Sequence, residues 1–160
     1  MERTNRKKGR VLVAMSGGVD SAASALYLLR EGYDVEGVTM LFCEGESSEN
    51  DAASAAETAR FLGIGHRVLD CRALFRDEVI VPFCEAYAAG KTPNPCVLCN
   101  FRAKFGALCA EAARDHFDHV ATGHYVNKEW SERYGRFVLK KADDGYAVRM
   151  PLLAFRGDYN

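Results

Sequence analysis

Short apolar runs alternate with longer amphipathic stretches through most of the chain. The apolar runs predict buried strands at residues 10–15, 35–42, 66–70 and 118–122. Apolar residues at helical spacing predict helices at residues 20–31, 50–62, 74–87 and 97–114. Pro82 is expected to kink or break the third helix. Strands that alternate with helices are typical of a parallel sheet covered on both faces, so the sequence predicts a doubly wound, mainly parallel α/β fold.

The end of the chain has a different pattern. Residues 136–141 and 146–150 flank the turn sequence Asp143-Asp144-Gly145, which predicts a C-terminal β-hairpin. No closing element is recognisable after it, so we interpret the tail as truncated or divergent. We expect a flexible basic leader at residues 1–9, one α/β domain at residues 10–126, and the hairpin with its tail at residues 127–160.

Composition limits the class of protein. The chain has 160 residues, of which 48% are hydrophobic and 27% charged, as in one ordinary globular domain. With a formal net charge of −1, any contact with nucleic acid has to come from a local patch. No apolar run is long enough to span a bilayer, and the N-terminus lacks a signal-peptide core. We therefore expect a cytoplasmic protein with no membrane partner.

Six cysteines are present, but nothing else indicates a secreted, disulfide-stapled protein. Cys71, Cys84 and Cys109 fall in apolar or helical stretches and are expected to be small core residues. Cys96 and Cys99 lie in a different setting.

The segment Ser16-Gly17-Gly18-Val19-Asp20-Ser21 joins the first predicted strand to the first predicted helix. Its two glycines allow a tight turn that brings backbone N–H groups close to an anion, and the helix adds free N–H groups and its dipole. Ser16 and Ser21 add hydroxyl donors, and Asp20 is suited to hold Mg²⁺ against phosphates. A Gly-Gly turn capped by Asp20 or Ser21 is the structural alternative. The complete SGGVDS pattern, which is neither a Walker A loop nor GxGxxG, favours a phosphate-binding loop.

A second segment indicates a reactive cysteine. Pro93 and Pro95 rigidify a loop before the fourth predicted helix. Cys99 is expected in the first turn of that helix, where the helix dipole favours a thiolate over a thiol. Nearby cations would act in the same direction, namely Lys91, Arg102 and Lys104.

The SGGVDS loop resembles the SGGxDS signature of the PP-loop ATP-pyrophosphatases, which have an adenine nucleotide alpha hydrolase-like fold. The resemblance implies that ATP is cleaved between its α- and β-phosphates, that the loop binds pyrophosphate, and that an oxygen of a second substrate is adenylated. It also implies a set of nucleotide-binding residues, namely Ala14, Met15, Ser16, Gly17, Gly18, Val19, Asp20, Ser21, Met40 and Gly123. Met40 would lie against the adenine, and a core methionine is the alternative.

Two further motifs specify the family. Gly90-Lys91-Thr92-Pro93-Asn94-Pro95-Cys96-Val97-Leu98-Cys99-Asn100 and the ATGHY sequence at residues 121–125 resemble segments of the tRNA-specific 2-thiouridylases, as does LGIGHRVLD around the third strand. The resemblance covers residues 10–126. It implies adenylation of the C2 oxygen of a wobble uridine and its replacement by sulfur, with tRNA and a persulfide sulfur donor protein as partners.

The same resemblance assigns roles in this reaction. It makes Cys99 the catalytic nucleophile and Asp20 a second catalytic residue. Asn94, Pro95 and Cys96 would contact the target base, and His124 would contact tRNA. For His124 a turn histidine is the structural alternative.

The chain also departs from the family pattern. The family's persulfide-carrying cysteine lies further downstream, and none of Cys43, Cys71, Cys84 and Cys109 lies in a matching segment. The family's Lys-Asp-Gln-Ser-Tyr stretch is absent near residues 139–144. We therefore expect this chain to bind ATP without thiolating tRNA by itself.

Alternatives remain for the cysteine pair and for the whole domain. Cys96 and Cys99 form a CxxC that could hold an iron–sulfur cluster with a third ligand, act as a redox pair, or supply half of a zinc site. We rank the nucleophile first, the cluster second and the redox pair third. Zinc comes last, because no second CxxC and no paired histidines are present. The rival functions are a PP-loop ligase acting on a small molecule and a non-catalytic nucleotide-binding domain.

Overall fold

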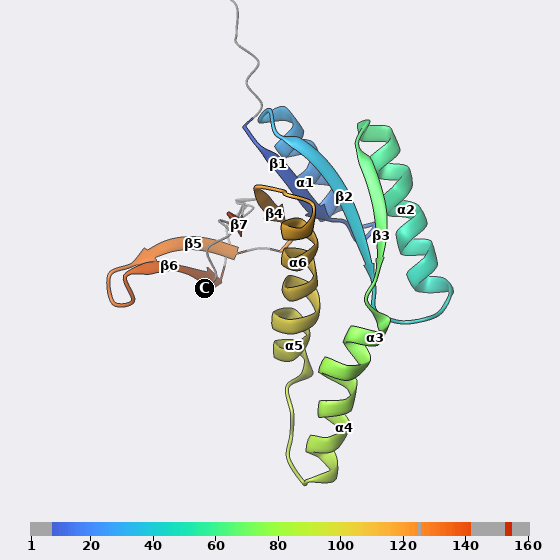
Figure 1. Ribbon diagram of the computed structural model, residues 1–160, viewed down its shortest axis with the longest axis vertical. Helices are drawn as coiled ribbons and strands as arrows, with labels where there is room; N and C mark the ends of the chain where they lie inside the picture. The colour runs from blue at the N-terminus through green and yellow to red at the C-terminus, as the bar shows by residue number, and fades with distance from the viewer. Residues whose placement is uncertain (1–7, 125, 142–152, 155–160) are drawn as a thin grey trace, which may run out of the picture.

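Four parallel strands and one short antiparallel strand form the central sheet, in the order β3-β2-β1-β4-β7 (Figure 1). The computed structural model describes residues 8–124, 126–141 and 153–154. The sheet consists of β1 (Arg10–Ala14), β2 (Asp34–Leu41), β3 (Gly65–Asp70), β4 (His119–Ala121) and β7 (Leu153–Ala154). The predicted doubly wound, mainly parallel α/β fold is confirmed.

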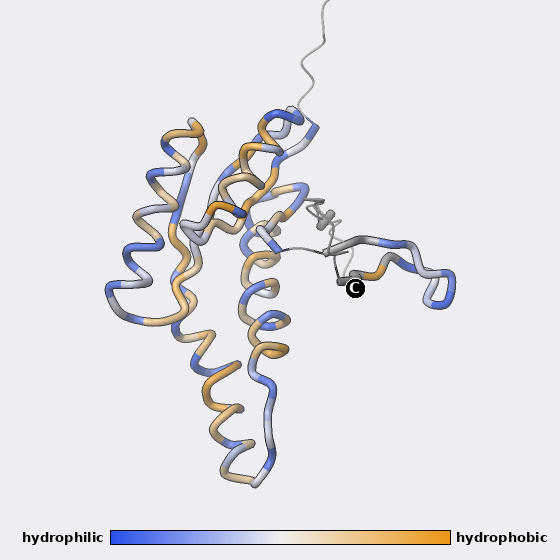
Figure 2. Tube along the Cα trace, turned by 180° about the vertical axis from the view of Figure 1, so that it is seen from behind, coloured by the Kyte–Doolittle hydropathy of each residue, from blue (hydrophilic) through white to orange (hydrophobic). Residues whose placement is uncertain are grey.

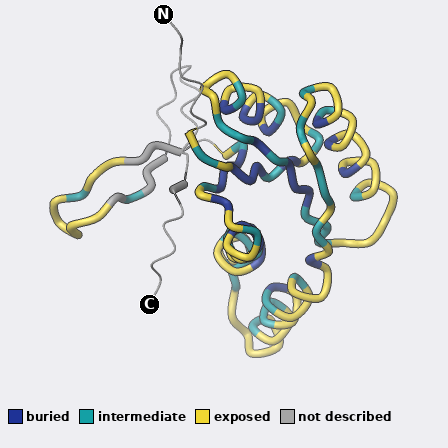
Figure 3. The backbone as a smooth tube through the Cα atoms, turned by 45° about the horizontal axis from the view of Figure 1, so that its top comes forward, coloured by how far each residue is buried: buried dark blue, intermediate teal, exposed yellow. Residues whose placement is uncertain are grey.

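Helices cover both faces of this sheet. α1 (Val19–Arg30) and α2 (Glu46–Leu62) pack on one face, where Val11, Val13 and Met15 of β1 and its end meet alanines and leucines of both helices. α6 (Gly106–Arg114) packs on the other face, where Leu12, Val38 and Val120 meet Leu108 and Ala112. Because neighbouring residues of a strand point to opposite faces, β1 is buried on both sides (Figure 3).

Two long helical runs connect β3 to β4 and extend past the sheet (Figure 1). The first consists of α3 (Arg72–Phe75), the π-helical segment η1 (Arg76–Ile80) and α4 (Val81–Ala88). The second consists of α5 (Pro95–Leu98), the π-helical segment η2 (Cys99–Phe105) and α6. Pro82 lies at the start of α4, directly after η1. The expected break is therefore a change of helical hydrogen bonding, because proline cannot donate the backbone bond of a regular α-helix.

Apolar residues are not confined to the core. Figure 2 shows them along the central strands and also on the two helical runs that leave the sheet. On these runs Val97 and Phe101 are 62% and 75% exposed. Of the helices in the described part of the chain, none is long and apolar enough to cross a membrane.

Two sequence expectations need correction, and one strand was not expected. α2 begins at Glu46, before the expected residue 50, because Gly45 at φ 120° ends the preceding loop. The strand at Arg136–Lys141 (β6) pairs antiparallel with β5 (Val126–Ser131), which the sequence did not indicate as a strand. The expected partner of β6, residues 146–150, lies outside the described part. Cys84 is exposed, not a core residue, whereas Cys71 is buried and Cys109 half-buried.

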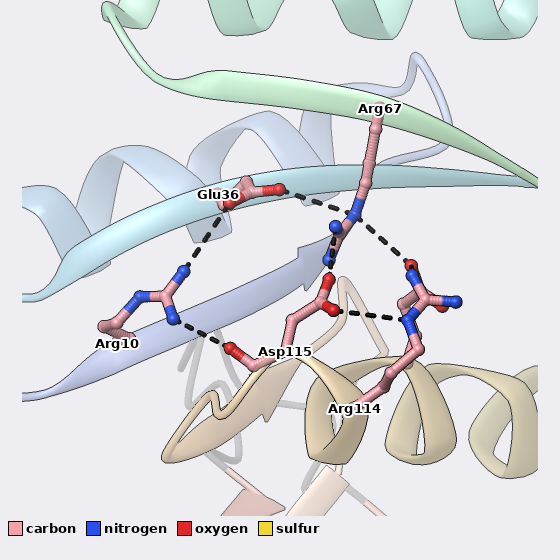
Figure 4. A network of polar contacts seen from close by, with 6 residues as sticks. Arg10, Glu36, Arg67, Arg114 and Asp115 are labelled. Atoms are coloured by element: carbon pink, nitrogen blue, oxygen red, sulfur yellow. Dashed lines mark hydrogen bonds and ion pairs between the residues drawn. The ribbon is translucent and has the colours of Figure 1, made fainter.

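A network of charged residues joins the sheet to α6 (Figure 4). Arg67 on β3 forms an ion pair with Asp115, and its Nε lies 3.4 Å from carboxylate oxygens of both Glu36 and Glu111. Arg114 also contacts Glu111 at 2.6 Å. Glu111 is 5% exposed, so these arginines compensate a carboxylate that is almost removed from water.

Candidate functional site

A pocket of about 420 Å³ opens where β1, β2 and β4 end at their carboxyl side. β1 lies between β2, which follows it through α1, and β4, which the chain reaches only after β3. Loops diverge at such a switch point, and ligands of parallel α/β sheets bind there. The lining residues come from five segments and are Ala14, Met15, Ser16, Asp20, Ser21, Thr39, Met40, Leu41, Phe42, Ser48, Asp51, Lys104, Thr122, Gly123 and His124.

The SGGVDS loop follows β1 and leads directly into α1. Gly17 has φ 75°, in the left-handed region that favours glycine. A Cβ at Gly17 would lie 2.8 Å from the backbone oxygen of Asp51, so α2 packs against the loop at this position. Gly18 precedes the first residue of α1. Asp20 and Ser21 in the first turn of this helix line the pocket, so the free N–H groups of the helix start are close to it.

Ser21 holds the loop together from inside. Its hydroxyl accepts a hydrogen bond from the Ser16 N–H at 3.3 Å and donates one to the Gly18 carbonyl at 2.9 Å. The side chain is 4% exposed. In this state the Ser21 proton is already used within the loop, so Ser21 shapes the anion site, and Ser16 is the serine with its side chain exposed.

The loop after β4 closes the pocket from the other side. A Cβ at Gly123 would lie 3.0 Å from the Ser21 nitrogen and 3.2 Å from the Asp20 carbonyl carbon. Only glycine permits this approach without displacing one of the two loops. Gly123 thus lies against the SGGVDS loop, while its contact with a nucleotide stays a prediction.

A buried hydroxyl fixes the end of β1. Thr39 donates a hydrogen bond to the Met15 carbonyl at 2.9 Å, and its Oγ1 lies 2.9 Å from Nε2 of His66 on β3. Since the Thr39 proton goes to Met15, His66 must donate from Nε2. Burial lowers the pKa of His66, which favours the neutral ring, and in that form this bond fixes the tautomer with the proton on Nε2. Three adjacent strands are linked in this way directly under the loop.

Met40 occupies an intermediate position. It lines the pocket, and it also packs against the core cluster of Leu12, Val38 and Leu108. The two roles considered for it from the sequence, adenine contact and core methionine, are therefore compatible in one side chain. Met15, which is 3% exposed, also lines the pocket.

The charged residues of the pocket come from opposite walls. Asp20 and Asp51 contribute carboxylates, and Lys104 contributes an ammonium. His124 lies beside Lys104, with Nδ1 3.0 Å from the Thr122 hydroxyl and its ring centroid 5.5 Å from that of Phe105. Burial, and then the charge of Lys104, lower the pKa of His124 below its ordinary value, so its ring is held neutral at neutral pH.

The family is identified by sequence comparison. The model of the tRNA methyl transferase HUP domain family matches residues 9–147. The chain belongs to this family. The HUP domain described here is 46% identical over 152 residues to the tRNA-specific 2-thiouridylase MnmA of Treponema denticola, a match that covers 91% of the chain and 42% of that relative. It is 44% identical over 146 residues to MnmA of Desulforamulus reducens, with 84% and 40% covered. The chain spans about two fifths of the length of these relatives.

Solved structures share the fold of this HUP domain. The U34-tRNA thiolase NcsA from Methanococcus maripaludis, solved with its [4Fe-4S] cluster, matches with a TM-score of 0.56 and 21% identity. That match covers 78% of this chain and 41% of NcsA. NMN synthetase from Francisella tularensis matches with a TM-score of 0.51 and 20% identity, with 71% and 44% covered. At this identity the likeness shows the architecture alone.

The residues predicted from the sequence fall into two groups in this HUP domain. Most of the predicted nucleotide-binding residues line the pocket, together with His124, while Gly17, Gly18 and Val19 form the part of the loop outside the lining. Asn94, Pro95, Cys96 and Cys99 do not line it. They lie further along the helical run that carries Lys104, toward its amino end.

Cys99 is placed differently from the expectation. Pro95 is the first helical residue, so Cys96 lies in the first turn and Cys99 is the fifth residue. The helix dipole acts mainly on the first turn, which Cys99 does not occupy. Arg102 forms an ion pair with Glu78 at 2.5 Å and is not free to act on either thiol. Cys96 is exposed and Cys99 half-buried.

The structure bears differently on the two metal hypotheses, magnesium at Asp20 and an iron–sulfur cluster at Cys96 and Cys99. Mg²⁺ bound to a nucleotide commonly uses one or two carboxylates together with phosphate oxygens, and Asp20 with Asp51 provides that number. An iron–sulfur cluster needs more protein ligands. Among residues 8–124, 126–141 and 153–154, no three His, Cys, Asp or Glu side chains gather closely enough to hold a metal ion. A cluster at Cys96 and Cys99 therefore needs ligands beyond these two cysteines and stays a hypothesis.

Sequence reasoning missed several lining residues. Thr39, Asp51 and Thr122 reach the pocket because the sheet order places β2, α2 and the β4 loop around it. Lys104 was noted only as a cation near Cys99. Its position in the pocket depends on how the η2–α6 run crosses the sheet, for which the sequence carries no local signal.

Proposed function

We propose that this chain is the ATP-binding and adenylating part of a tRNA-specific 2-thiouridylase. The observation that carries the proposal is the contact between the two loops of the switch point, with Gly123 of ATGHY against Ser21 of SGGVDS. Two sequence-distant family motifs thereby line the same pocket, which is large enough for a nucleotide. The identity with curated 2-thiouridylases supports the choice of substrate, a wobble uridine in tRNA.

In the proposed reaction the loop binds the triphosphate through its backbone N–H groups and the start of α1. The C2 oxygen of the uridine attacks the α-phosphorus, and the bond between that phosphorus and the bridging oxygen of pyrophosphate breaks. The loop donors stabilise the charge that develops on the departing pyrophosphate. A persulfide R–S–S⁻, supplied by a donor protein, then attacks C2 with its terminal sulfur, and AMP leaves with the former uridine oxygen. A cysteine thiolate, that of Cys99 in this scheme, attacks the inner sulfur of the resulting C2–S–S–R adduct. The S–S bond breaks, a disulfide forms with R–S, and the outer sulfur stays on C2 as 2-thiouridine.

Individual residues have distinct roles in this scheme. Asp20, together with Asp51, would hold Mg²⁺, which neutralises phosphate charge when it is bound. Met40 would contact the adenine. Asn94, Pro95 and Cys96 would contact the base, and His124 the tRNA. Cys99 would be the nucleophile that handles sulfur, five residues before Lys104 on the same π-helical segment. Cytoplasmic localisation follows from such a substrate.

The family name refers to methyl transfer, which we do not assign to this chain. A sulfonium methyl donor carries no phosphate and would make no use of a loop of backbone N–H groups at a helix start. The rival PP-loop ligase for a small molecule stays open, because the loop and its pocket would serve it equally. The TPNPCVLCN segment, which the pocket does not need, favours a macromolecular substrate.

Exchange of labelled pyrophosphate into ATP tests the proposal on the full chain. We expect exchange that requires the matching tRNA, and its loss in Asp20→Asn. Exchange with a small amide or acid acceptor in place of tRNA would favour the small-molecule ligase. Failure to bind ATP at all would refute the proposal.

A second measurement addresses Cys99. With ATP, tRNA and a persulfide donor, we expect this chain alone to form no 2-thiouridine. In a longer protein that contains this domain, Cys99→Ser should abolish thiolation and leave pyrophosphate exchange in place. Undiminished thiolation by Cys99→Ser would remove the nucleophile role.

A further inference from the structure

The charge of the pocket does not match the ligand proposed for it. The phosphates of a nucleoside triphosphate carry several negative charges, which catalysts of phosphoryl transfer meet with cations. The carboxylates of Asp20 and Asp51 add negative charge to the lining. His124 is held neutral by burial and by Lys104. Among the described lining residues, Lys104 is therefore the one side chain with a full positive charge.

Lys104 also differs from the other cations of the helical runs. Arg72, Arg76 and Arg102 each pair with a carboxylate, at 2.5 to 2.9 Å. Within the described part of the chain, Lys104 has no such ion pair or hydrogen bond. Its segment is fixed on both sides, since Ala103 is fully buried and the Phe105 ring contacts His124. A half-buried ammonium at a fixed position, without a carboxylate partner, is suited to a charged ligand.

The π-helical geometry of η2 relates Lys104 to Cys99. In an α-helix five residues make about 1.4 turns, which would direct the two side chains to different faces. Hydrogen bonding from residue i to i+5 makes five residues about one turn. Cys99 and Lys104, the first and sixth residues of η2, therefore lie on the same side of the helix. A group bound at Lys104 therefore lies on the same side of the helix as Cys99.

We infer that Lys104 is a catalytic residue that contacts the phosphates of the bound nucleotide, on the wall opposite the SGGVDS loop. The ammonium donates to phosphate oxygens and supplies the positive charge that the loop and the carboxylates lack. Through η2 it holds the activated phosphate on the same side of the helix as Cys99. This inference rests on the proposed binding of ATP.

Nucleotide affinity measured by calorimetry on the full chain tests it, with ATP and adenosine as ligands and Mg²⁺ present. Lys104→Met should weaken ATP binding by about 10- to 100-fold, as expected for loss of a charge-assisted hydrogen bond. It should leave adenosine binding within about twofold, because adenosine has no phosphate. Lys104→Arg should keep most of the ATP affinity.

Arg102→Met is the matched control, since Arg102 lies on the same π-helical segment but pairs with Glu78 outside the pocket lining. It should leave both affinities unchanged. Lys104→Gln provides the same test if Lys104→Met does not fold, as judged by circular dichroism.

The outcomes separate the two proposals. If the wild-type chain does not bind ATP, the proposed function fails. If the wild-type chain binds ATP and the Lys104 variants bind it equally well, or if they lose adenosine and ATP to the same extent, the assignment of Lys104 to the phosphates is overturned.

Discussion

Gly123 lies so close to Ser21 that an added methyl group would stand 3.0 Å from the Ser21 backbone nitrogen. The two residues belong to loops that follow β4 and β1, the strands on either side of the switch point. Their contact sets the width of the pocket at the point where the anion would bind.

Gly123→Ala is expected to weaken ATP binding by about tenfold, because the loops must move apart and small displacements at a binding site have large effects. Isothermal calorimetry with ATP measures this. Gly65→Ala is the control, since a Cβ there meets Glu36 at an ordinary 3.5 Å. Equal affinities of both variants and the wild type would show that the loop contact is unimportant for binding.

Gly17 and Gly18 should respond differently to the same substitution. Gly17 has φ 75° and would place a Cβ 2.8 Å from the Asp51 oxygen, whereas Gly18 has φ −87° and ample room. We expect Gly17→Ala to lose about 1 to 3 kcal/mol of unfolding free energy and most nucleotide affinity. Gly18→Ala should lose less than about 1 kcal/mol. Urea unfolding measures both, and the reverse order would contradict the structure.

Thr39→Val should destabilise the protein and loosen the end of β1. The substitution keeps the shape but leaves the Met15 carbonyl and His66 Nε2 without their shared partner. The expected loss is about 1 to 3 kcal/mol in unfolding free energy, with weaker ATP binding. Thr39→Ser retains the hydroxyl and should recover most of both. Equal behaviour of valine and serine at this position would indicate that the hydroxyl has no part in positioning the loop.

The charged network at α6 should contribute more to the free energy of unfolding than the exposed ion pairs do. Arg67→Met removes one of the two arginines at the buried Glu111, with an expected loss of about 2 kcal/mol in unfolding free energy. This is below the value for a fully buried pair, because the Arg67 side chain is 31% exposed. Arg72→Met removes an exposed pair with Asp70, which water screens, and should lower the free energy of unfolding by clearly less. Thermal unfolding in low salt compares the two, and similar losses would refute the distinction.

Stability should fall in acid partly through Asp115. Arg114 and Arg67 hold the pKa of this carboxyl below its ordinary value of 3.8. A group with a depressed folded pKa stabilises the fold above its unfolded pKa, and this contribution is lost as the pH falls through the folded pKa. The difference in urea midpoint between wild type and Asp115→Asn should therefore be constant near pH 6 and shrink below about pH 4. A difference that does not change with acid would contradict this.

The sequence predicted what depends on local pattern. The strands, the α1 and α6 helices and the position of SGGVDS follow from periodicity and from glycine punctuation such as Gly63, which ends α2 at φ 71°. The α/β class follows from the order of these elements. The pairing of β6 with β5 could not be predicted in this way. Asp143-Asp144-Gly145 is a stronger local turn signal than residues 132–135, which form the turn between β5 and β6 in the structure.

The site was only half predictable for a related reason. Loop residues such as Ser16, Asp20 and Gly123 belong to motifs that are recognisable in one dimension. Lys104 and Asp51 enter the pocket through tertiary packing, and two π-helical segments alter which side chains share a face. The exposure of Cys84 and the position of Cys99 beyond the first helical turn depend on the same two π-helical segments. The helix propensities of the residues do not indicate where such segments occur.

The two walls of the pocket are separated by about a hundred residues of sequence, between Ser21 and Gly123. A growing chain therefore cannot retain a nucleotide at this pocket until β4 has emerged from the ribosome and joined the sheet beside β1. A ligand that binds both walls favours only the fully assembled state, by about 2.7 kcal/mol at a concentration one hundred times its Kd. Cellular nucleotide supply would thus influence how much of the newly made protein survives proteolysis.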